Sequence, residues 1–133
     1  MLIPYLAIGV GGALGANARY LLGSWVSTQW GAHFPVATLL INVSGSWALG
    51  VYLTLVTERF TRHEATRLLV ATGLLGAYTT FSTFSVEALH LIETGDVVAG
   101  LNYVVASVVL SIVACAIGMI VAHALVSRSA RGL

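Results

Sequence analysis

The amino-acid sequence predicts an all-α integral membrane protein, a single domain over residues 1–133 in which four helices cross the bilayer. Composition is the first observation: 58% of the residues are hydrophobic and only 8% are charged, whereas soluble domains carry about 25% charged residues. A chain of 133 residues has too little interior to hide so much apolar surface from water. The second observation is that four segments stay apolar over about 20 residues, the length that crosses the hydrocarbon layer.

The four expected spans are separated by short polar segments, which contain most of the charged residues. The spans cover residues 2–24, 35–57, 68–91 and 97–126. Pro35 suits the first turn of the second span, where its missing N–H removes no helical hydrogen bond. The single cysteine, Cys115, lies inside the fourth span and cannot form an intramolecular disulfide.

The arginines predict an orientation. An even number of spans places both termini and the 58–67 segment on the same side of the membrane. Five of the six basic residues lie there, the sequence has no lysine, and only Arg19 is near the opposite face. Basic residues concentrate on the cytoplasmic side, so both termini are expected in the cytoplasm.

The first span carries a pattern for close helix packing. Gly11 and Gly15 form a G-x-x-x-G pair, and small residues at this spacing let two helix backbones approach in lipid. Arg19 near the end of this span is expected to reach the interface or to find a partner there.

The second span has one polar face, on which Thr38, Asn42, Ser46 and Gly50 recur every four residues. An amide at the depth of Asn42 needs a hydrogen-bond partner or water. Asn42 therefore either packs by bonding across to another helix or offers its N–H groups to a ligand.

The third span is predicted to be broken near its middle, within residues 73–85. Gly73 and Gly76 are followed by Thr79, Thr80 and further hydroxyl residues, and both glycine and β-branched residues disfavour helix. A break in the membrane frees backbone carbonyls, which is tolerated only where they meet protein, an ion or water. The alternative is a continuous helix whose hydroxyls bond to their own backbone.

The fourth span also has a polar face. Tyr103, Ser107, Ser111, Cys115 and Gly118 fall on one side of the helix. These hydroxyls either form a polar track through the membrane or bond back to the carbonyls of their own helix.

Several function classes lack the residues that they need. The only acid within a span is Glu87, near one end of the third span, and the histidines lie in loops or near helix ends. A net charge of +1 without a basic cluster argues against nucleic-acid binding, and we expect no enzyme because no nucleophile–base pair or metal-ligand spacing occurs. Neutral donors without a central charge suit a small ion that binds weakly enough to leave.

Three motifs carry a resemblance to a known family. They are the segments 12–20 (GALGANARY), 42–45 (NVSG) and 76–85 (GAYTTFSTFS). The sequence resembles the Fluc (CrcB) fluoride channel family, and the likeness covers the whole chain in length and in the number of helices. Ala77 stands where the family often has a second glycine, a mild departure.

The resemblance implies a passive channel that exports fluoride from the cytoplasm, here across the cell inner membrane. It implies an antiparallel, dual-topology homodimer with two fluoride pores and a structural sodium ion (Na+) on the two-fold axis. The sodium ion would be bound by the backbone carbonyls of Gly76 and Thr79. The implied fluoride pathway comprises Asn42, Phe81, Ser82, Thr83, Phe84, Tyr103, Ser107 and Ser111.

Three other classes remain as alternatives. A small multidrug-type transporter would need an acid in the first span, and the sequence has none there. A non-transporting membrane subunit would use the polar faces for packing only. An intramembrane protease would need a buried serine–histidine pair, and the histidines are misplaced for it.

Overall fold

The computed structural model describes residues 2–31, 33–59 and 64–131. Within these ranges all regular structure is helical and no strand occurs, as the sequence predicts. The elements are α1 (Leu2–Trp30), α2 (Val36–Arg59), α3 (Glu64–Arg67), the π-helix η1 (Leu68–Leu75), α4 (Gly76–Tyr78), α5 (Phe81–Glu93) and α6 (Val97–Arg131). Of the arginines behind the predicted orientation, Arg62 lies outside the described residues, as do the side chains of Arg59 and Arg131.

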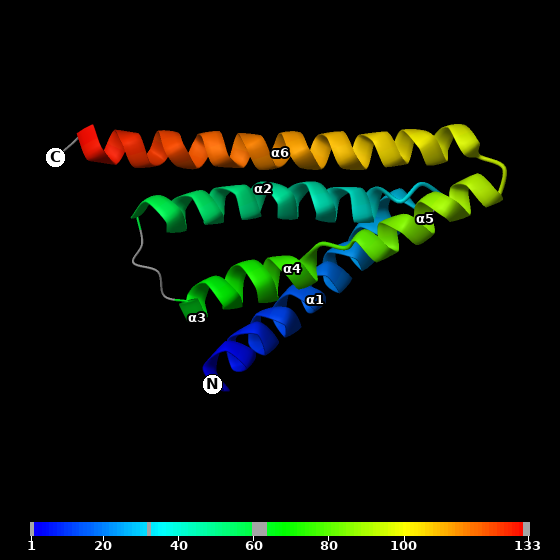
Figure 1. Ribbon diagram of the computed structural model, residues 1–133. Coiled ribbons are helices and arrows are strands. Elements are labelled where there is room, and N and C mark those ends of the chain that lie inside the picture. Colours follow the sequence, from blue (N-terminus) through cyan, green and yellow to red (C-terminus); the bar gives the residue numbers. More distant parts are fainter. Residues whose placement is uncertain (1, 32, 60–63, 132–133) are drawn as a thin grey trace.

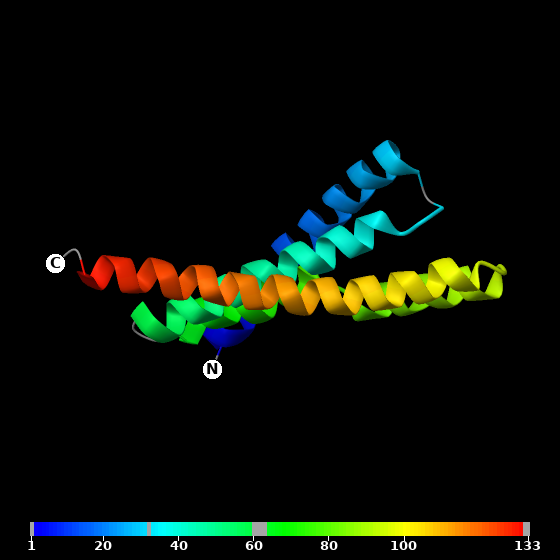
Figure 2. The same ribbon diagram turned by 90° about the horizontal axis from the view of Figure 1, so that it is seen from above.

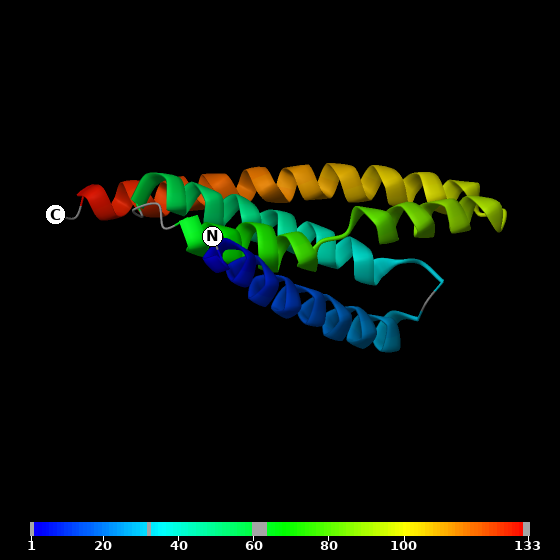
Figure 3. The same ribbon diagram turned by 60° about the horizontal axis from the view of Figure 1, so that its bottom comes forward.

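The long helices run back and forth between two ends of the molecule (Figure 1). The end of α2 and the start of α3 lie at the same end as both termini, and the α1–α2 and α5–α6 connections lie at the other. Seen from above, α1 crosses the remaining helices at an angle, while α2 and α6 run side by side (Figure 2). The second turned view shows the same arrangement, with η1 and α4 next to the first half of α1 (Figure 3).

Helices α2 and α6 form one tight pair. A Cβ added at Gly50 would overlap the Cys115 carbonyl oxygen, and one added at Gly118 would overlap the Trp47 carbonyl oxygen. Backbone approaches this close are open only to glycine, so the small residues on both helices decide how the pair packs.

Helix α1 packs against η1 through the predicted G-x-x-x-G pair. A Cβ at Gly11 would overlap the Leu69 carbonyl oxygen, and a Cβ at Gly15 would overlap the Leu74 carbonyl oxygen. The packing role expected for these two glycines is confirmed. The partner segment is a π-helix of eight residues, a rare geometry that frequently occurs at functional sites.

Three helical segments of the described chain are long and apolar enough to cross a membrane: residues 36–57, 64–93 and 97–128. Helix α1 has 29 residues but is not among them, because glycines, Asn17 and Arg19 lower its mean hydropathy. Large apolar side chains such as Leu21, Val98 and Ile120 are at least 66% exposed. An outer surface of this kind is suited to contact with lipid tails rather than with water.

Candidate functional site

The candidate site is built around Thr79 and Thr80, where the helical backbone is interrupted. Helix α4 ends at Tyr78 and α5 begins at Phe81. Between them Thr79 has a ψ of 159°, and Thr80 has a φ of −151° and a ψ of 119°, both in the extended region. β-Branched side chains favour this region. The interruption falls within the 73–85 segment in which the sequence predicts a break.

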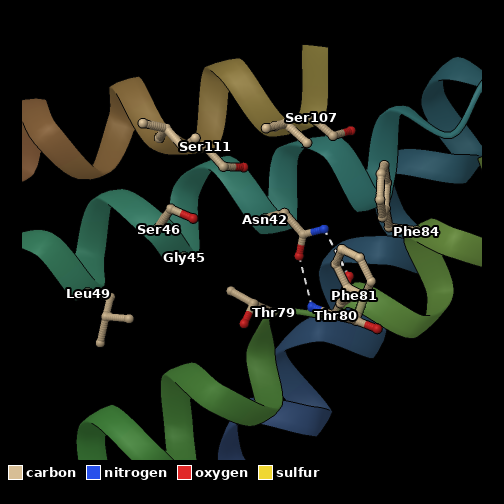
Figure 4. A pocket seen from close by; sticks show the side chains of 12 residues that line it. Asn42, Gly45, Ser46, Leu49, Thr79, Thr80, Phe81, Phe84, Ser107 and Ser111 are labelled. Carbon is tan, nitrogen blue, oxygen red and sulfur yellow. Dashed lines mark hydrogen bonds between the residues drawn. The ribbon is translucent and has the colours of Figure 1, made fainter. Parts of the chain in front are cut away.

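The Asn42 side chain of α2 bonds to both the N–H and the carbonyl of Thr80, where the helix is interrupted. The Thr80 N–H donates to Asn42 Oδ1 at 2.8 Å, and Asn42 Nδ2 donates to the Thr80 carbonyl oxygen at 3.0 Å. Both contacts are seen in Figure 4. The amide has a second N–H, for which the structure gives no acceptor among the residues it describes.

The Thr80 hydroxyl caps the N-terminus of α5. Thr80 Oγ1 accepts a hydrogen bond from the Thr83 N–H at 3.2 Å and donates to Thr83 Oγ1 at 3.0 Å. Ser82 Oγ lies 3.3 Å from the same hydroxyl. Threonine is a favourable residue at this position because its oxygen satisfies an N–H that the helix cannot.

Because of these two sets of contacts, two backbone carbonyls lack the N–H donors that they would have in a continuous helix. In a continuous helix the N–H of residue i donates to the carbonyl of residue i−4, so Thr80 would donate to Gly76 and Thr83 to Thr79. Instead, the Thr80 N–H is held by Asn42 and the Thr83 N–H by the Thr80 hydroxyl. Gly76 and Thr79 are the residues whose carbonyls the sequence resemblance assigns to sodium.

A cavity of about 310 Å³ lies beside the break, between α2, α5 and α6 (Figure 4). All side chains that line it are uncharged. They belong to Asn42, Gly45, Ser46, Leu49, Thr79, Thr80, Phe81, Phe84, Ser107, Val108, Ser111 and Ile112. Asn42, Phe81, Phe84, Ser107 and Ser111, five of the eight residues expected on the fluoride pathway, therefore meet in one place.

The Ser107 hydroxyl differs from the other polar groups of this cavity wall in its hydrogen bonding. Its residue is only 5% exposed, and Ser107 Oγ has no hydrogen-bond partner in the described part of the chain. A buried hydroxyl without a partner is costly, by about 1–3 kcal/mol. The residue lines the cavity, while the hydroxyl oxygen itself is enclosed by the surrounding protein atoms.

The two phenylalanines stand close together at the start of α5. The Phe81 and Phe84 ring centroids are 5.4 Å apart, with 50° between the ring planes. Phe84 is 7% exposed and belongs to the core, whereas Phe81 is 78% exposed. The Phe81 ring therefore projects from the described part of the chain, where lipid or another protein chain can cover it.

Thr83 faces a second cavity, of about 340 Å³, whose other lining residues include Arg19, Thr38 and Glu87. Ser82 is exposed and lines neither this cavity nor the one beside Asn42. Gly76 lies outside both linings as well. The structure thus distributes the expected residues over several environments rather than one.

Tyr103, the remaining residue expected on the pathway, is fully buried behind the first cavity. Its hydroxyl donates to Glu87 Oε2 at 2.7 Å, and Thr38 donates to Glu87 Oε1 at 2.9 Å. Its ring lies 5.3 Å from that of Phe84. The sequence alone does not connect Thr38, Glu87 and Tyr103, although Thr38 and Tyr103 each stand one turn before a residue of the cavity wall.

Comparison with known proteins places the chain in a family. Residues 6–119 match the family described as CrcB-like protein, Camphor Resistance (CrcB). Proteins named fluoride-specific ion channel FluC are similar over nearly the full length. The one from Rhizobium etli is 45% identical over 94% of this chain and 100% of its own length. The one from Roseiflexus sp. is 46% identical over 90% of this chain and 97% of its own length. The one from Saccharophagus degradans is 45% identical over 94% of this chain and 93% of its own length.

The relatives are named as ion channels rather than as enzymes, which agrees with the expectation that this chain is not an enzyme. Together with three helices of membrane-crossing length and composition, the relatives indicate a membrane protein. The resemblance drawn from the glycine and hydroxyl motifs is confirmed, and the chain belongs to the CrcB family.

Proposed function

We propose that the protein is a fluoride-selective passive channel that exports fluoride from the cytoplasm across the cell inner membrane. One observation carries the proposal: an uncharged cavity that is lined by Asn42, Ser107 and two phenylalanine rings, with a Ser107 hydroxyl that has no hydrogen-bond partner among the described residues. The fluoride-specific channels of Rhizobium etli and Roseiflexus sp., similar over most of the chain, support the choice of ion.

The groups that line the cavity suit a small anion that must bind and then dissociate. Hydroxyl and amide groups donate hydrogen bonds without fixing a full charge. A phenyl ring is positive at its edge, so the Phe81 and Phe84 rings can meet an anion edge-on. Binding by several weak donors keeps the ion exchangeable, which conduction requires.

The channel is proposed to be an antiparallel, dual-topology homodimer of four-span subunits with two pores. Helix α1 would be the fourth span, since 29 residues of helix reach about 43 Å. Phe81 is 78% exposed although it lines the cavity, and Ser82 and Thr83 beside it are exposed too. A second copy laid across the break would cover these residues and close the pathway.

A structural sodium ion is proposed at the centre of the dimer. The carbonyls of Gly76 and Thr79 are suitable ligands, because the N–H groups that would bond them in a helix are engaged elsewhere. Uncharged carbonyl oxygens suit a monovalent cation. Two such carbonyls from each subunit would supply its oxygen ligands, and the positive charge would lie near the anion pathway.

The test is fluoride efflux from liposomes that contain the purified protein, followed with a fluoride electrode. We expect efflux without any proton gradient and no comparable efflux of chloride. Efflux that required a proton gradient would favour a coupled transporter, and absence of efflux would favour a non-transporting subunit.

Ser107→Ala links the flux to the cavity. Removing the hydroxyl deletes one donor and also relieves an unsatisfied buried group, so fluoride efflux should fall while the free energy of unfolding stays equal or rises by about 1 kcal/mol. Ser127→Ala is the matched control, since Ser127 Oγ bonds to the Ala124 carbonyl near the end of α6. Equal efflux from parent and Ser107→Ala would remove this cavity from the pathway.

A further inference from the structure

Thr80 occupies a special place between the two cavities. Among the residues that the structure describes, it alone lines both the cavity beside Asn42 and the one beside Arg19. It is 9% exposed. Its backbone bonds to Asn42 and its hydroxyl bonds to Thr83. One residue therefore connects the amide on α2 to the start of α5.

We propose that Thr80 is a positioning residue for anion passage, which holds the Asn42 amide in the orientation that leaves one N–H free for the cavity. The proposal rests on the channel function given above. It concerns how Asn42 is made ready to donate, and it assigns Thr80 no direct contact with the ion.

The backbone of Thr80 selects one orientation of the amide. A backbone N–H can only donate and a carbonyl can only accept. Asn42 must therefore turn Oδ1 toward the Thr80 N–H and Nδ2 toward the Thr80 carbonyl oxygen, as it does at 2.8 Å and 3.0 Å. Turning the amide over would set donor against donor and acceptor against acceptor. While both bonds remain, the Asn42 amide therefore cannot turn over and swap the positions of its oxygen and its nitrogen.

The side chain of Thr80 keeps the backbone in the conformation that makes both bonds possible. The two bonds need the extended backbone of Thr80, with φ −151° and ψ 119°. The hydroxyl fixes this conformation by capping α5 through the Thr83 N–H. The neighbouring Thr79 differs, since its hydroxyl bonds back to the Leu75 carbonyl at 3.1 Å. The positioning role therefore belongs to the Thr80 hydroxyl and not to hydroxyls of the break in general.

The experiment uses two pairs of side chains that differ in the hydroxyl. Thr80→Val is compared with the parent, and Thr80→Ala with Thr80→Ser. Loss of the cap should lower fluoride efflux by roughly fivefold in the Val and Ala variants, and Thr80→Ser should recover the parent rate. Thr57→Val is the control, because Thr57 donates only to the Leu53 carbonyl of its own helix, and it should keep the parent rate.

A second readout follows the Asn42 amide directly. The chain has three asparagines, at positions 17, 42 and 102, so the side-chain amide signals of ¹⁵N-asparagine-labelled protein are few, and Asn42→Ala identifies the signal of interest. In the parent and in Thr80→Ser, the bonded Asn42 proton should exchange slowly with solvent. In Thr80→Val and Thr80→Ala, the exchange should be faster by roughly fivefold.

The two readouts separate the possible failures. Unchanged exchange at Asn42 in both hydroxyl-free variants would overturn the positioning role, as would parent-level efflux in both. Failure of Thr80→Ser to recover exchange and efflux would overturn it too. Absence of fluoride efflux from the parent would refute the channel function, and the exchange rates would then still decide whether Thr80 orders the amide.

Discussion

At the scale of single residues, the site depends on where polar groups find their partners. The sequence predicts that Asn42 either bonds across to another helix or offers its N–H groups to a ligand. In the structure it bonds to the Thr80 backbone with one N–H and its oxygen, and it also lines the cavity. The two roles are compatible, because an amide has two N–H groups.

Asn42→Asp is predicted to lose both stability and efflux. Asp keeps the shape but sets an oxygen against the Thr80 carbonyl oxygen, where the amide now donates. Leaving such buried groups unpaired costs about 1–3 kcal/mol, and a negative charge at the cavity should lower fluoride efflux by at least about tenfold. Thermal unfolding and efflux measure the two effects. A variant that folds and conducts at the parent rate would restrict Asn42 to packing.

The two phenylalanines are predicted to differ in stability but not in function. Isoleucine keeps apolar bulk and removes the ring quadrupole, so Phe81→Ile and Phe84→Ile should both lower fluoride efflux several-fold. Only Phe84→Ile should unfold more easily, by about 1–3 kcal/mol, because Phe84 is part of the buried cluster with Ala88, Leu91 and Tyr103.

Phe34→Ile serves as the control for the ring substitutions. Phe34 contacts Tyr103 edge to face, with ring centroids 5.6 Å apart, but it does not line the cavity beside Asn42. Its replacement should therefore leave efflux unchanged. Parent-level efflux in both Phe81→Ile and Phe84→Ile would show that the two rings contribute only to packing.

At the scale of helices, glycine decides which pairs come together. The contacts of α1 with η1 and of α2 with α6 both bring backbone carbonyl oxygens into space that a Cβ would fill. In lipid, helices associate through such close packing because lipid tails are as apolar as the side chains. The break at Thr79 and Thr80 is thus held between helices that are themselves fixed by glycine contacts.

Two adjacent glycines of α1 offer a matched test of this packing. Gly11→Ala should destabilise the protein by about 1–3 kcal/mol, because its Cβ would overlap the Leu69 carbonyl oxygen. Gly12→Ala meets no atom within 4 Å and should stabilise the helix by up to about 1 kcal/mol. Tryptophan fluorescence during thermal unfolding in detergent measures both. Equal midpoints for the two variants would contradict the packing model.

At the scale of the whole molecule, two features bear on the proposed dimer. Phe81 lies 78% exposed at the cavity, and the Gly76 and Thr79 carbonyls have lost their helical donors. Both features are consistent with the dimer and the sodium ion proposed above. A second antiparallel copy and a central cation would satisfy them together.

Removal of sodium is predicted to weaken the dimer and to reduce flux. The protein would be prepared in a large organic cation, which is too big to replace sodium between carbonyl oxygens. Dimer lifetime in detergent and fluoride efflux should both fall, and added sodium should restore them. Unchanged lifetime and efflux in the organic cation would exclude a structural role for sodium.

The sequence by itself determined the helical class, the membrane environment, the glycine packing of α1 and the family, because each follows from composition or from short motifs along the chain. It also predicts an interruption within residues 73–85, since glycine and β-branched residues weaken a helix wherever they occur. These are local properties of the chain. They need no knowledge of which helix lies beside which.

Only the tertiary structure decided which polar groups meet. Asn42 reaches Thr80 across 38 positions of the chain, and Thr38 reaches Glu87 across 49. Such pairs depend on the angle and register at which glycine contacts set the helices, and a periodicity gives only the face of one helix. For the same reason the sequence does not reveal that the Tyr103 phenol bonds to Glu87, whereas Ser107, one turn later on α6, lines the cavity.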